Sequence, residues 1–337
     1  MRVLVTGAAG LLGGEICARL AREGHEVTGL VHRNRDIRAN DDSPVDIATV
    51  AGDVSVPWFD WEEGEFARLA ASHDLLVHCA ATVRFDLDEA DYAAVNVDGT
   101  KHALALARQG GMDFLHVSTA FVCGRRDGAI LESDPLPEAG FANGYEASKA
   151  AGERLVRASD LRWAIARPSI VVGAYESGAI RQFDTTYAAF KLIAEGRVKH
   201  MPARAGATLD FVPIDHVAVG IVALAHAMEQ AAGKTFHLVS AQPLPVTDFT
   251  GAIGKFAQFH EPELVEPSAF DPATLPALER RLFKRVAGLY VSYFQRDPHF
   301  DDANVREVLG MECPETGRTY IRRLIEYCID VGFLPAD

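Results

Sequence analysis

The sequence predicts an α/β fold in which a doubly wound parallel sheet is followed by a smaller, mostly helical region toward the C-terminus. Short apolar runs alternate with alanine-rich helical patterns through the first half of the 337 residues. A glycine-rich turn follows the first apolar run, and a late apolar run at 234–240 has the pattern of a strand returning to the sheet. Such alternation is typical of a parallel sheet with helices on both faces.

The first strand pattern is RVLVTG, a helix pattern follows at 11–24, and EVTGLVHR forms the second strand pattern. The apolar and β-branched composition of the runs, and the helical spacing of Leu12, Ile16 and Leu20, support these assignments. The remaining elements are expected as strands at 75–80, 113–119, 162–168 and 234–240 and as helices at 215–230 and in the C-terminal segment TYIRRLIEYCIDVGFL.

Composition and charge exclude several classes of function. The chain is 48% hydrophobic and 24% charged, which is ordinary for a globular protein. Its net charge of −14 argues against a general electrostatic role on nucleic acid or on an anionic membrane. No signal peptide is evident, and no apolar run approaches the ~18 residues that indicate a membrane span.

The five cysteines indicate a reducing compartment. They lie mostly in apolar runs and lack the spacing of a CxxC pair or of a metal-ligand set. We therefore expect reduced thiols, no disulfide, no metal site and a cytoplasmic location. The cysteines are Cys17, Cys79, Cys123, Cys313 and Cys328.

The turn TGAAGLLG, residues 6–13, predicts a Rossmann-type dinucleotide site. Gly7 permits a tight turn, Gly10 lets the backbone approach a pyrophosphate, and Gly13 allows the helix to pack closely on the sheet. The anion then lies at the positive end of the helix. A glycine-rich turn without a ligand is the alternative, and the position directly after the first strand favours the dinucleotide.

The end of the second strand favours NADP. An NAD enzyme carries an acid there to bind the ribose hydroxyl, whereas this chain has His32, Arg33 and Arg35. Guanidinium groups pair well with a phosphate, so the 2′-phosphate of NADP fits better. Arg38 is interpreted as a solvated surface residue. Asp53 can accept a hydrogen bond from the adenine amino group, and a turn-forming role is the close alternative.

The stretch GYEASKAAGERL places Tyr145 and Lys149 four residues apart, so both side chains share one face of a helix. On spacing alone, an amphipathic surface helix is the better interpretation. When the stretch is considered together with four other motifs, a catalytic role for Tyr145 and Lys149 becomes the better interpretation. The motifs TGAAGLLG, HCAAT at 78–82, NVDGT at 96–100, VSTAFVCG at 117–124 and YEASK at 145–149, in this order, resemble the extended short-chain dehydrogenase/reductase family.

The resemblance covers residues 1–240 and implies a catalytic set. In this family the tyrosine donates the proton, and the lysine binds the nicotinamide ribose and lowers the pKa of the phenol. These roles fall on Tyr145 and Lys149. Thr119 matches the residue that hydrogen-bonds the substrate oxygen, with Ser118 as the alternative, and strand alternation favours Thr119.

The resemblance also implies the remaining cofactor contacts. Asn96 is expected to fix local backbone, Ala80 and Ala81 to let the cofactor pass or to pack helix on sheet, and Pro168 to lie beside the carboxamide or to end a strand. The expected cofactor contacts are Gly7, Gly10, Leu11, Leu12, Gly13, His32, Arg33, Arg35, Asp53, Val54, Ala80, Ala81, Thr82, Asn96, Tyr145, Lys149, Pro168 and Ile170.

Within the family, the segments HCAATVRFD, HVSTAFVCG, NGYEASKAAGERL and LDFVPIDHVA are most similar to the male-sterility branch, which includes fatty acyl-CoA reductases and thioester reductase domains. This resemblance implies an NADPH-dependent reductase of a carbonyl or an acyl thioester, with aldehyde formation favoured. The alternatives are a ketone or aldehyde reductase or alcohol dehydrogenase acting on a hydrophobic substrate, an NAD-dependent sugar-nucleotide epimerase or dehydratase, and a non-catalytic dinucleotide sensor. The basic VHRNR argues against the epimerase, and an intact catalytic set argues against the sensor.

These expectations divide the chain. Residues 1–170 form the NADP-binding domain, to which 211–240 returns, and residues 171–210 and 241–337 bind a small-molecule or carrier-bound acyl substrate. The cationic and apolar segment 279–296 is interpreted as a lid over the substrate cleft rather than a peripheral membrane contact. A homodimer is left open.

Other charged residues receive weaker interpretations. Asp215 is expected to cap a helix and Asp210 to fasten two regions, so these two and His216 are assigned no chemistry. A last group of cations can meet a pyrophosphate or phosphopantetheine, although scattered solvated cations are the preferred interpretation. This group is Arg181, Arg197, Lys199 and Arg204.

Overall fold

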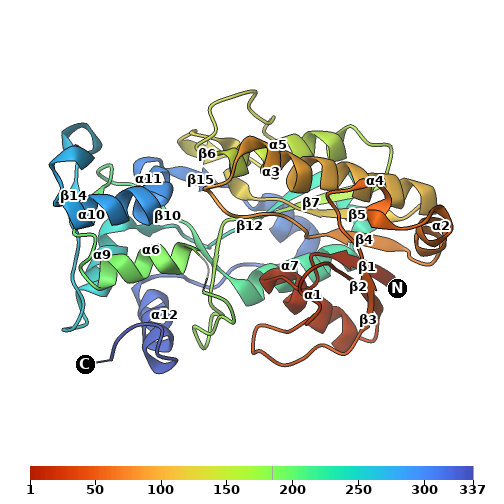
Figure 1. Ribbon diagram of the computed structural model, residues 1–337, viewed down its shortest axis with the longest axis horizontal. Helices are drawn as coiled ribbons and strands as arrows, with labels where there is room; N and C mark the ends of the chain where they lie inside the picture. The colour runs from red at the N-terminus through yellow and green to blue at the C-terminus, as the bar shows by residue number, and fades with distance from the viewer. Residues whose placement is uncertain (184, 337) are drawn as a thin grey trace.

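A computed structural model describes residues 1–183 and 185–336 and has a seven-stranded parallel sheet at its centre (Figure 1). The strand order is β12-β7-β5-β4-β1-β2-β3, so the chain moves outward from β1 in both directions. This doubly wound order confirms the predicted fold class, and it opens a crevice at the carboxyl ends of the central strands. The strands are β1 (Arg2–Thr6), β2 (Glu26–Val31), β3 (Ala48–Ala51), β4 (Leu75–His78), β5 (Asp113–Val117), β7 (Trp163–Pro168) and β12 (Lys234–Leu238).

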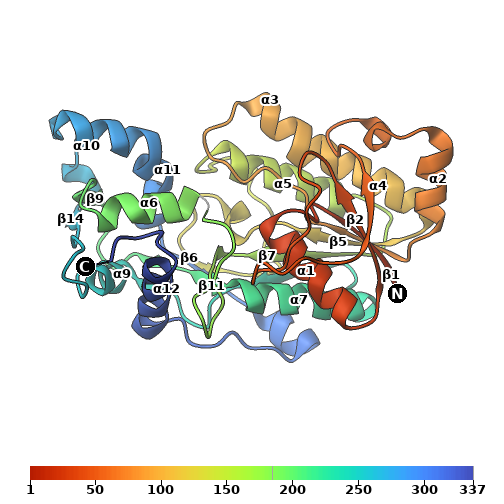
Figure 2. The ribbon, with the colours of Figure 1, turned by 60° about the horizontal axis from the view of Figure 1, so that its bottom comes forward.

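Helices cover both faces of the sheet (Figures 1 and 2). Alternate side chains of β1 point to opposite faces, so Val3 and Val5 pack with α1 and α7, whereas Leu4 packs with α2 and α4. Both faces are therefore buried, which explains the nearly continuous apolar strands. The helices of the sheet region are α1 (Leu11–Arg22), α2 (Glu63–Ala71), α3 (Glu89–Tyr92), α4 (Gly99–Gly110), α5 (Gly144–Arg157), α7 (Ile214–His226) and α8 (Met228–Ala231).

The remaining elements gather beyond the carboxyl ends of the strands, at the left of Figure 1. They enclose a second hydrophobic core, built largely from aromatic and branched side chains. Its helices are α6 (Thr185–Ala194), α9 (Val246–Ile253), α10 (Ala277–Leu282), α11 (Gly288–Gln295) and α12 (Arg318–Asp330). The short strands are β6 (Gly128–Ile130), β8 (Ile170–Val172), β9 (His200–Pro202), β10 (Thr208–Leu209), β11 (Phe211–Pro213), β13 (Leu244–Pro245), β14 (Glu263–Val265) and β15 (Pro298–Phe300).

The structure corrects several local expectations. The strand predicted at 113–119 ends at Val117, and the helix predicted at 215–230 is interrupted at Ala227. Asp215 does not cap α7, because the capping position is Pro213; its carboxylate instead accepts the backbone N–H of Tyr175 at 3.1 Å. Asp210 does fasten two segments, since it accepts the Ser169 hydroxyl and the Ser240 backbone N–H.

Helix α5 is held by two buried ion pairs at opposite ends. Arg167 of β7 binds Glu153 through two N–H···O bonds of 2.8 Å, and both side chains are at most 2% exposed. Arg296, just after α11, binds Glu146 with both terminal nitrogens and donates to the carbonyl oxygen of Gly124. Paired guanidinium and carboxylate groups tolerate burial because each satisfies the other's charge and hydrogen bonds.

None of the helices within 1–183 and 185–336 is long and apolar enough to cross a bilayer.

We expect the substitution Arg167→Met to lower the free energy of unfolding by about 3–5 kcal/mol, because it leaves the Glu153 carboxylate buried without its main partner. Arg157 lies 3.4 Å from the same carboxylate and remains as a partner, so we expect the loss of unfolding free energy to be near the lower end of this range. Urea unfolding measures the change. The control is Arg162→Met, which removes an exposed pair with Asp113 and should cost about 0–1 kcal/mol. Equal losses in the two variants would contradict the prediction.

Candidate active site

A cavity of about 450 Å³ opens at the carboxyl ends of the central strands and continues into the second core. One end of the cavity is the glycine turn after β1. Its middle is formed by the residues that follow β4, β5 and β7, together with helix α5. Of the residues predicted from the sequence, the cavity is lined by Gly7, Gly10, Leu11, Leu12, Gly13, Ala81, Thr119, Tyr145, Lys149, Pro168 and Ile170.

The glycine turn is packed too tightly for side chains. Gly7 has φ +69°, and a Cβ there would lie 2.7 Å from the backbone nitrogen of Ala80. A Cβ on Gly13 would lie 2.2 Å from the carbonyl oxygen of Gly7. Among the described residues no side chain caps α1 at Gly10, so the first N–H groups of the helix face the cavity as an anion site. The turn therefore fits the pyrophosphate of a dinucleotide.

Arg181 joins this turn from the loop after β8. Its guanidinium donates to the carbonyl oxygen of Gly10 at 3.2 Å. Asn40 holds the loop in place, because its amide oxygen accepts the Arg181 backbone N–H and its amide nitrogen donates to Ala179. Arg181 is therefore fixed beside the glycine turn, and its contact with a pyrophosphate stays a prediction. None of the four cations of that group lines the cavity; the other three are Arg197, Lys199 and Arg204.

The residues after β2 form a separate polar cluster at the surface. His32, Arg33 and Arg35 are exposed, and the His32 Nε2 lies 3.4 Å from the Asp53 carboxylate. Burial alone would raise the pKa of Asp53, but hydrogen bonds from Ser55 and the charges of His32 and Arg33 lower it. Asp53 is thus an ionised turn residue with one oxygen bound to Ser55.

Asn96 has the structural role expected of it. Its amide oxygen accepts the Thr82 backbone N–H, and its amide nitrogen donates to the Thr82 carbonyl and to the Ser148 hydroxyl of α5. The strand-end loop after β4 is thereby tied to α5. Val54 is buried against Gly99, and Ala80 donates its backbone N–H to the Thr6 hydroxyl, so these two also support the turn without lining the cavity.

The predicted catalytic side chains converge at the middle of the cavity. Tyr145 and Lys149 lie on the first turns of α5, which Asn143 caps by accepting the Glu146 backbone N–H at 2.9 Å. Thr119 follows β5 and caps a short 3-10 helix, and its hydroxyl donates to the carbonyl oxygen of Pro168 at 3.3 Å. Ser118 and Thr119 both line the cavity, so the choice of Thr119 stays a prediction.

The electrostatics of Tyr145 differ from what the resemblance implies. Burial raises the pKa of Tyr145, and the hydrogen bond with Thr119 only partly opposes that increase. Burial also lowers the pKa of Lys149 to about 8, and the ammonium donates to the carbonyl oxygen of Val117 at 2.7 Å. The pKa of the phenol is therefore above its ordinary value, not below it. Tyr145 is neutral at physiological pH and keeps its proton.

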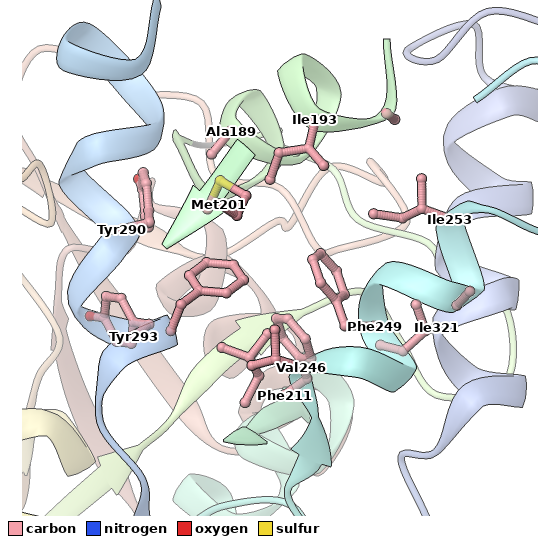
Figure 3. Close-up of a cluster of buried hydrophobic side chains, with 14 of the residues drawn as sticks. Ala189, Ile193, Met201, Phe211, Val246, Phe249, Ile253, Tyr290, Tyr293 and Ile321 are labelled. Carbon is pink, nitrogen blue, oxygen red and sulfur yellow. The ribbon is translucent and has the colours of Figure 1, made fainter. Parts of the chain in front are cut away.

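Beyond these three residues the cavity becomes an apolar chamber. Side chains from α6, β9, α9, α11 and α12 point toward one another around it (Figure 3). Phe85, in the loop after β4, lies between this chamber and the catalytic residues. Its ring centroid is 5.5 Å from that of Tyr145 and 5.2 Å from that of Tyr290. The chamber residues include Phe85, Tyr187, Phe190, Met201, Phe211, Phe249, Tyr290, Tyr293, Phe294, Ile321, Leu324 and Ile325.

The segment 279–296 covers this chamber. It forms α10, a π-helical stretch and α11, and its residues Ala287, Tyr290, Tyr293 and Phe294 line the cavity. The large aromatic side chains of the segment thus face inward, as the lid interpretation requires. Sequence reasoning missed most of the chamber, because its members come from elements far apart in the chain. The one local signal for the chamber was Phe85, which lies within the segment HCAATVRFD that the sequence analysis had already singled out.

Comparisons with known proteins agree with this geometry. The family model described as male sterility protein matches residues 5–221. L-2-aminoadipate reductase of Schizosaccharomyces pombe is 26% identical over 329 residues, covering 86% of this chain and 22% of that protein. Fatty acyl-CoA reductase 1 of Gallus gallus is 27% identical over 269 residues, covering 64% of this chain and 52% of that protein.

A solved structure matches nearly the whole chain. It is the terminal R domain from the myxalamid PKS-NRPS biosynthetic pathway, with a TM-score of 0.86 and 26% identity, covering 99% of this chain and 92% of that one. The two curated relatives are longer, and this chain spans 52% or less of their length. The family match, the glycine turn and the seven-stranded sheet agree. The chain belongs to the male sterility protein family and is a nicotinamide dinucleotide-dependent oxidoreductase with the extended short-chain dehydrogenase/reductase fold.

Proposed function

We propose that the chain is an NADPH-dependent reductase that converts an acyl thioester to an aldehyde, with Tyr145 as the proton donor. The observation that carries this proposal is the continuity of the cavity, which runs from the glycine turn past Thr119, Tyr145 and Lys149 into the apolar chamber. An acyl chain fits such a chamber, because each buried methylene contributes about 0.8 kcal/mol. The similarity to a fatty acyl-CoA reductase and to a terminal R domain supports the same substrate class.

The chain offers distinct groups to each part of the cofactor. The glycine turn, the start of α1 and Arg181 hold the pyrophosphate, and Arg33 and Arg35 bind the 2′-phosphate at the surface. Lys149 binds the nicotinamide ribose. The reduced nicotinamide supplies a hydride when bound. In this proposal the cofactor lies along the wall formed by the sheet and α5, and the substrate lies along the wall formed by residues 171–210 and 241–337.

Thr119 and Tyr145 act on the substrate oxygen. Both hydroxyls donate hydrogen bonds to the thioester carbonyl, and they stabilise the negative charge that develops there as the carbon is reduced. Collapse of the resulting hemithioacetal oxyanion breaks the carbon–sulfur bond and expels the thiolate. The raised pKa of Tyr145 keeps its proton available for these steps at neutral pH. The products are an aldehyde and a free thiol.

The chamber also admits a second candidate function. An apolar pocket separates substrates of similar shape by only ~1–3 kcal/mol, so a hydrophobic ketone or aldehyde is a competing substrate. The two functions use the same hydride acceptor geometry and the same proton donor. They differ in whether a thiol is released.

We expect NADPH to bind at least about tenfold more tightly than NADH, because each charge-assisted hydrogen bond to the 2′-phosphate contributes ~1.5–3 kcal/mol. Arg33→Ala should remove most of this preference. The matched control is Arg181→Ala, which should weaken both cofactors alike, because both contain the pyrophosphate that Arg181 faces. Fluorescence titration of both nucleotides against the unmodified chain and the two variants measures the six affinities. Equal binding of NADPH and NADH by the unmodified chain would refute the assignment of the 2′-phosphate site.

We expect Tyr145→Phe to lower turnover by about 100-fold or more while leaving NADPH binding nearly unchanged, the usual scale for a lost general acid. The control is Tyr327→Phe, which removes a phenol hydroxyl from α12 outside the cavity lining. Single-turnover oxidation of NADPH with the preferred substrate gives both rates. If Tyr145→Phe turned over like the control, another group would have to donate the proton.

The substrate class is tested by incubating the chain with NADPH and medium- or long-chain acyl-CoA or acyl-carrier protein. We expect free thiol and aldehyde to appear in equal amounts, with one NADPH consumed for each. Hydrophobic ketones and aldehydes without a thioester serve as the comparison. Consumption of NADPH with those compounds, and no thiol released from any thioester, would leave the carbonyl reductase as the function.

A further inference from the structure

A cluster of metal-ligating side chains lies on the sheet region, outside the cavity described above. Glu23 and His25 flank the turn between α1 and β2, and His226 is the last residue of α7. The two histidines are 201 positions apart in the chain, and α1 packs against α7 on one face of the sheet. One oxygen or nitrogen from each of the three residues lies within 4.8 Å of the others.

The separations of these atoms match a metal site. The Nε2 atoms of His25 and His226 are 3.4 Å apart. The Glu23 Oε2 lies 2.8 Å from the His226 Nε2 and 3.8 Å from the His25 Nε2. A point in the plane of the three atoms lies about 2.0 Å from each of them, at the short end of the ~2.0–2.2 Å bond length of zinc to imidazole nitrogen and carboxylate oxygen. Small rotations of Glu23 and His226, which are nearly half exposed, bring the angles at the ion toward tetrahedral. The ring centres are 4.9 Å apart, farther than the nitrogens, so the nitrogens face each other.

Hydrogen bonding alone does not satisfy this arrangement. A proton on the His226 Nε2 satisfies the carboxylate of Glu23 but leaves the two Nε2 atoms facing each other, whereas a proton on the His25 Nε2 bridges the two rings but leaves the carboxylate facing a lone pair. The His25 Nδ1 lies 3.4 Å from the Met1 amino group. One divalent cation accepts all three lone pairs at once.

We propose that Glu23, His25 and His226 form a binding site for a divalent transition metal of the zinc type. Glu23 and His226 are nearly half exposed, so the ion has an entry path and room for a water as its fourth ligand. The metal joins the end of α1 to the end of α7 and closes a long loop of chain, which stabilises the folded state. The cysteine spacing could not predict this site, because its ligands are histidine and glutamate brought together only by the fold. The site is independent of the proposed reduction.

The test uses the full chain without an affinity tag and Zn²⁺ as the probe. Isothermal titration should give one site per chain, and Zn²⁺ at about 100 times its dissociation constant should raise the Tm by about 5 °C. Co²⁺ at the same site should show the visible absorption of a tetrahedral complex. His226→Ala should lower the Zn²⁺ affinity by at least about 100-fold, because loss of an outer-shell partner alone costs ~10–100-fold.

Two further variants decide the result. Glu23→Gln keeps a hydrogen-bond acceptor and should also weaken Zn²⁺ binding, which covers the case in which His226→Ala unfolds. His299→Ala removes an exposed histidine that pairs with Asp297 on another surface, and it should bind Zn²⁺ like the unmodified chain. The proposal is overturned if the unmodified chain does not bind Zn²⁺, if Glu23→Gln and a folded His226→Ala bind it as tightly as the unmodified chain, or if His299→Ala loses binding equally.

Discussion

The position of α5 is the constraint on which the site depends. This helix carries Tyr145 and Lys149, and both of its ends are fixed by buried guanidinium–carboxylate pairs. One pair joins the helix to a strand of the sheet, and the other joins it to the end of the lid segment. Buried charges tolerate little displacement, because any loosening exposes a carboxylate to an apolar environment. The phenol and the ammonium are therefore held relative to both walls of the cavity.

The same pairs explain how two hydrophobic cores act as one site. The Arg296 guanidinium lies 4.8 Å from the ring centroids of both Phe121 and Tyr293, which pack edge to face, while its charge reaches Glu146. The cation thus stabilises the second core and the helix that carries Tyr145 together. Loop 179–181 makes a corresponding connection at the cofactor end, through Asn40 and the turn at Gly10. Polar contacts thus join the sheet region to the second core at both ends of the cavity, and the interior between them is apolar.

The sequence was sufficient wherever the signal was local. The glycine turn, the positions of the central strands along the chain and the spacing of Tyr145 and Lys149 are encoded within short segments, and the structure places them as predicted. The short edge strand β3 was not predicted, because its ATVA pattern is exposed and lacks a clear apolar run. The contact of Arg181 with the glycine turn was not predicted, because Asn40 and Gly10, which hold it there, are distant in the sequence. The direction of the Tyr145 pKa shift depends on burial by distant elements, which no motif records.

The pair between Arg296 and Glu146 also has a consequence for modularity. Residues beyond 240 look like an exchangeable segment, since much of the chamber wall comes from them. Yet that segment supplies the counter-ion of the residue next to Tyr145. A chimaera that exchanges this segment would have to inherit an arginine in register with Glu146. Recombination of the segment is therefore constrained by an electrostatic contact as well as by the shape of the chamber.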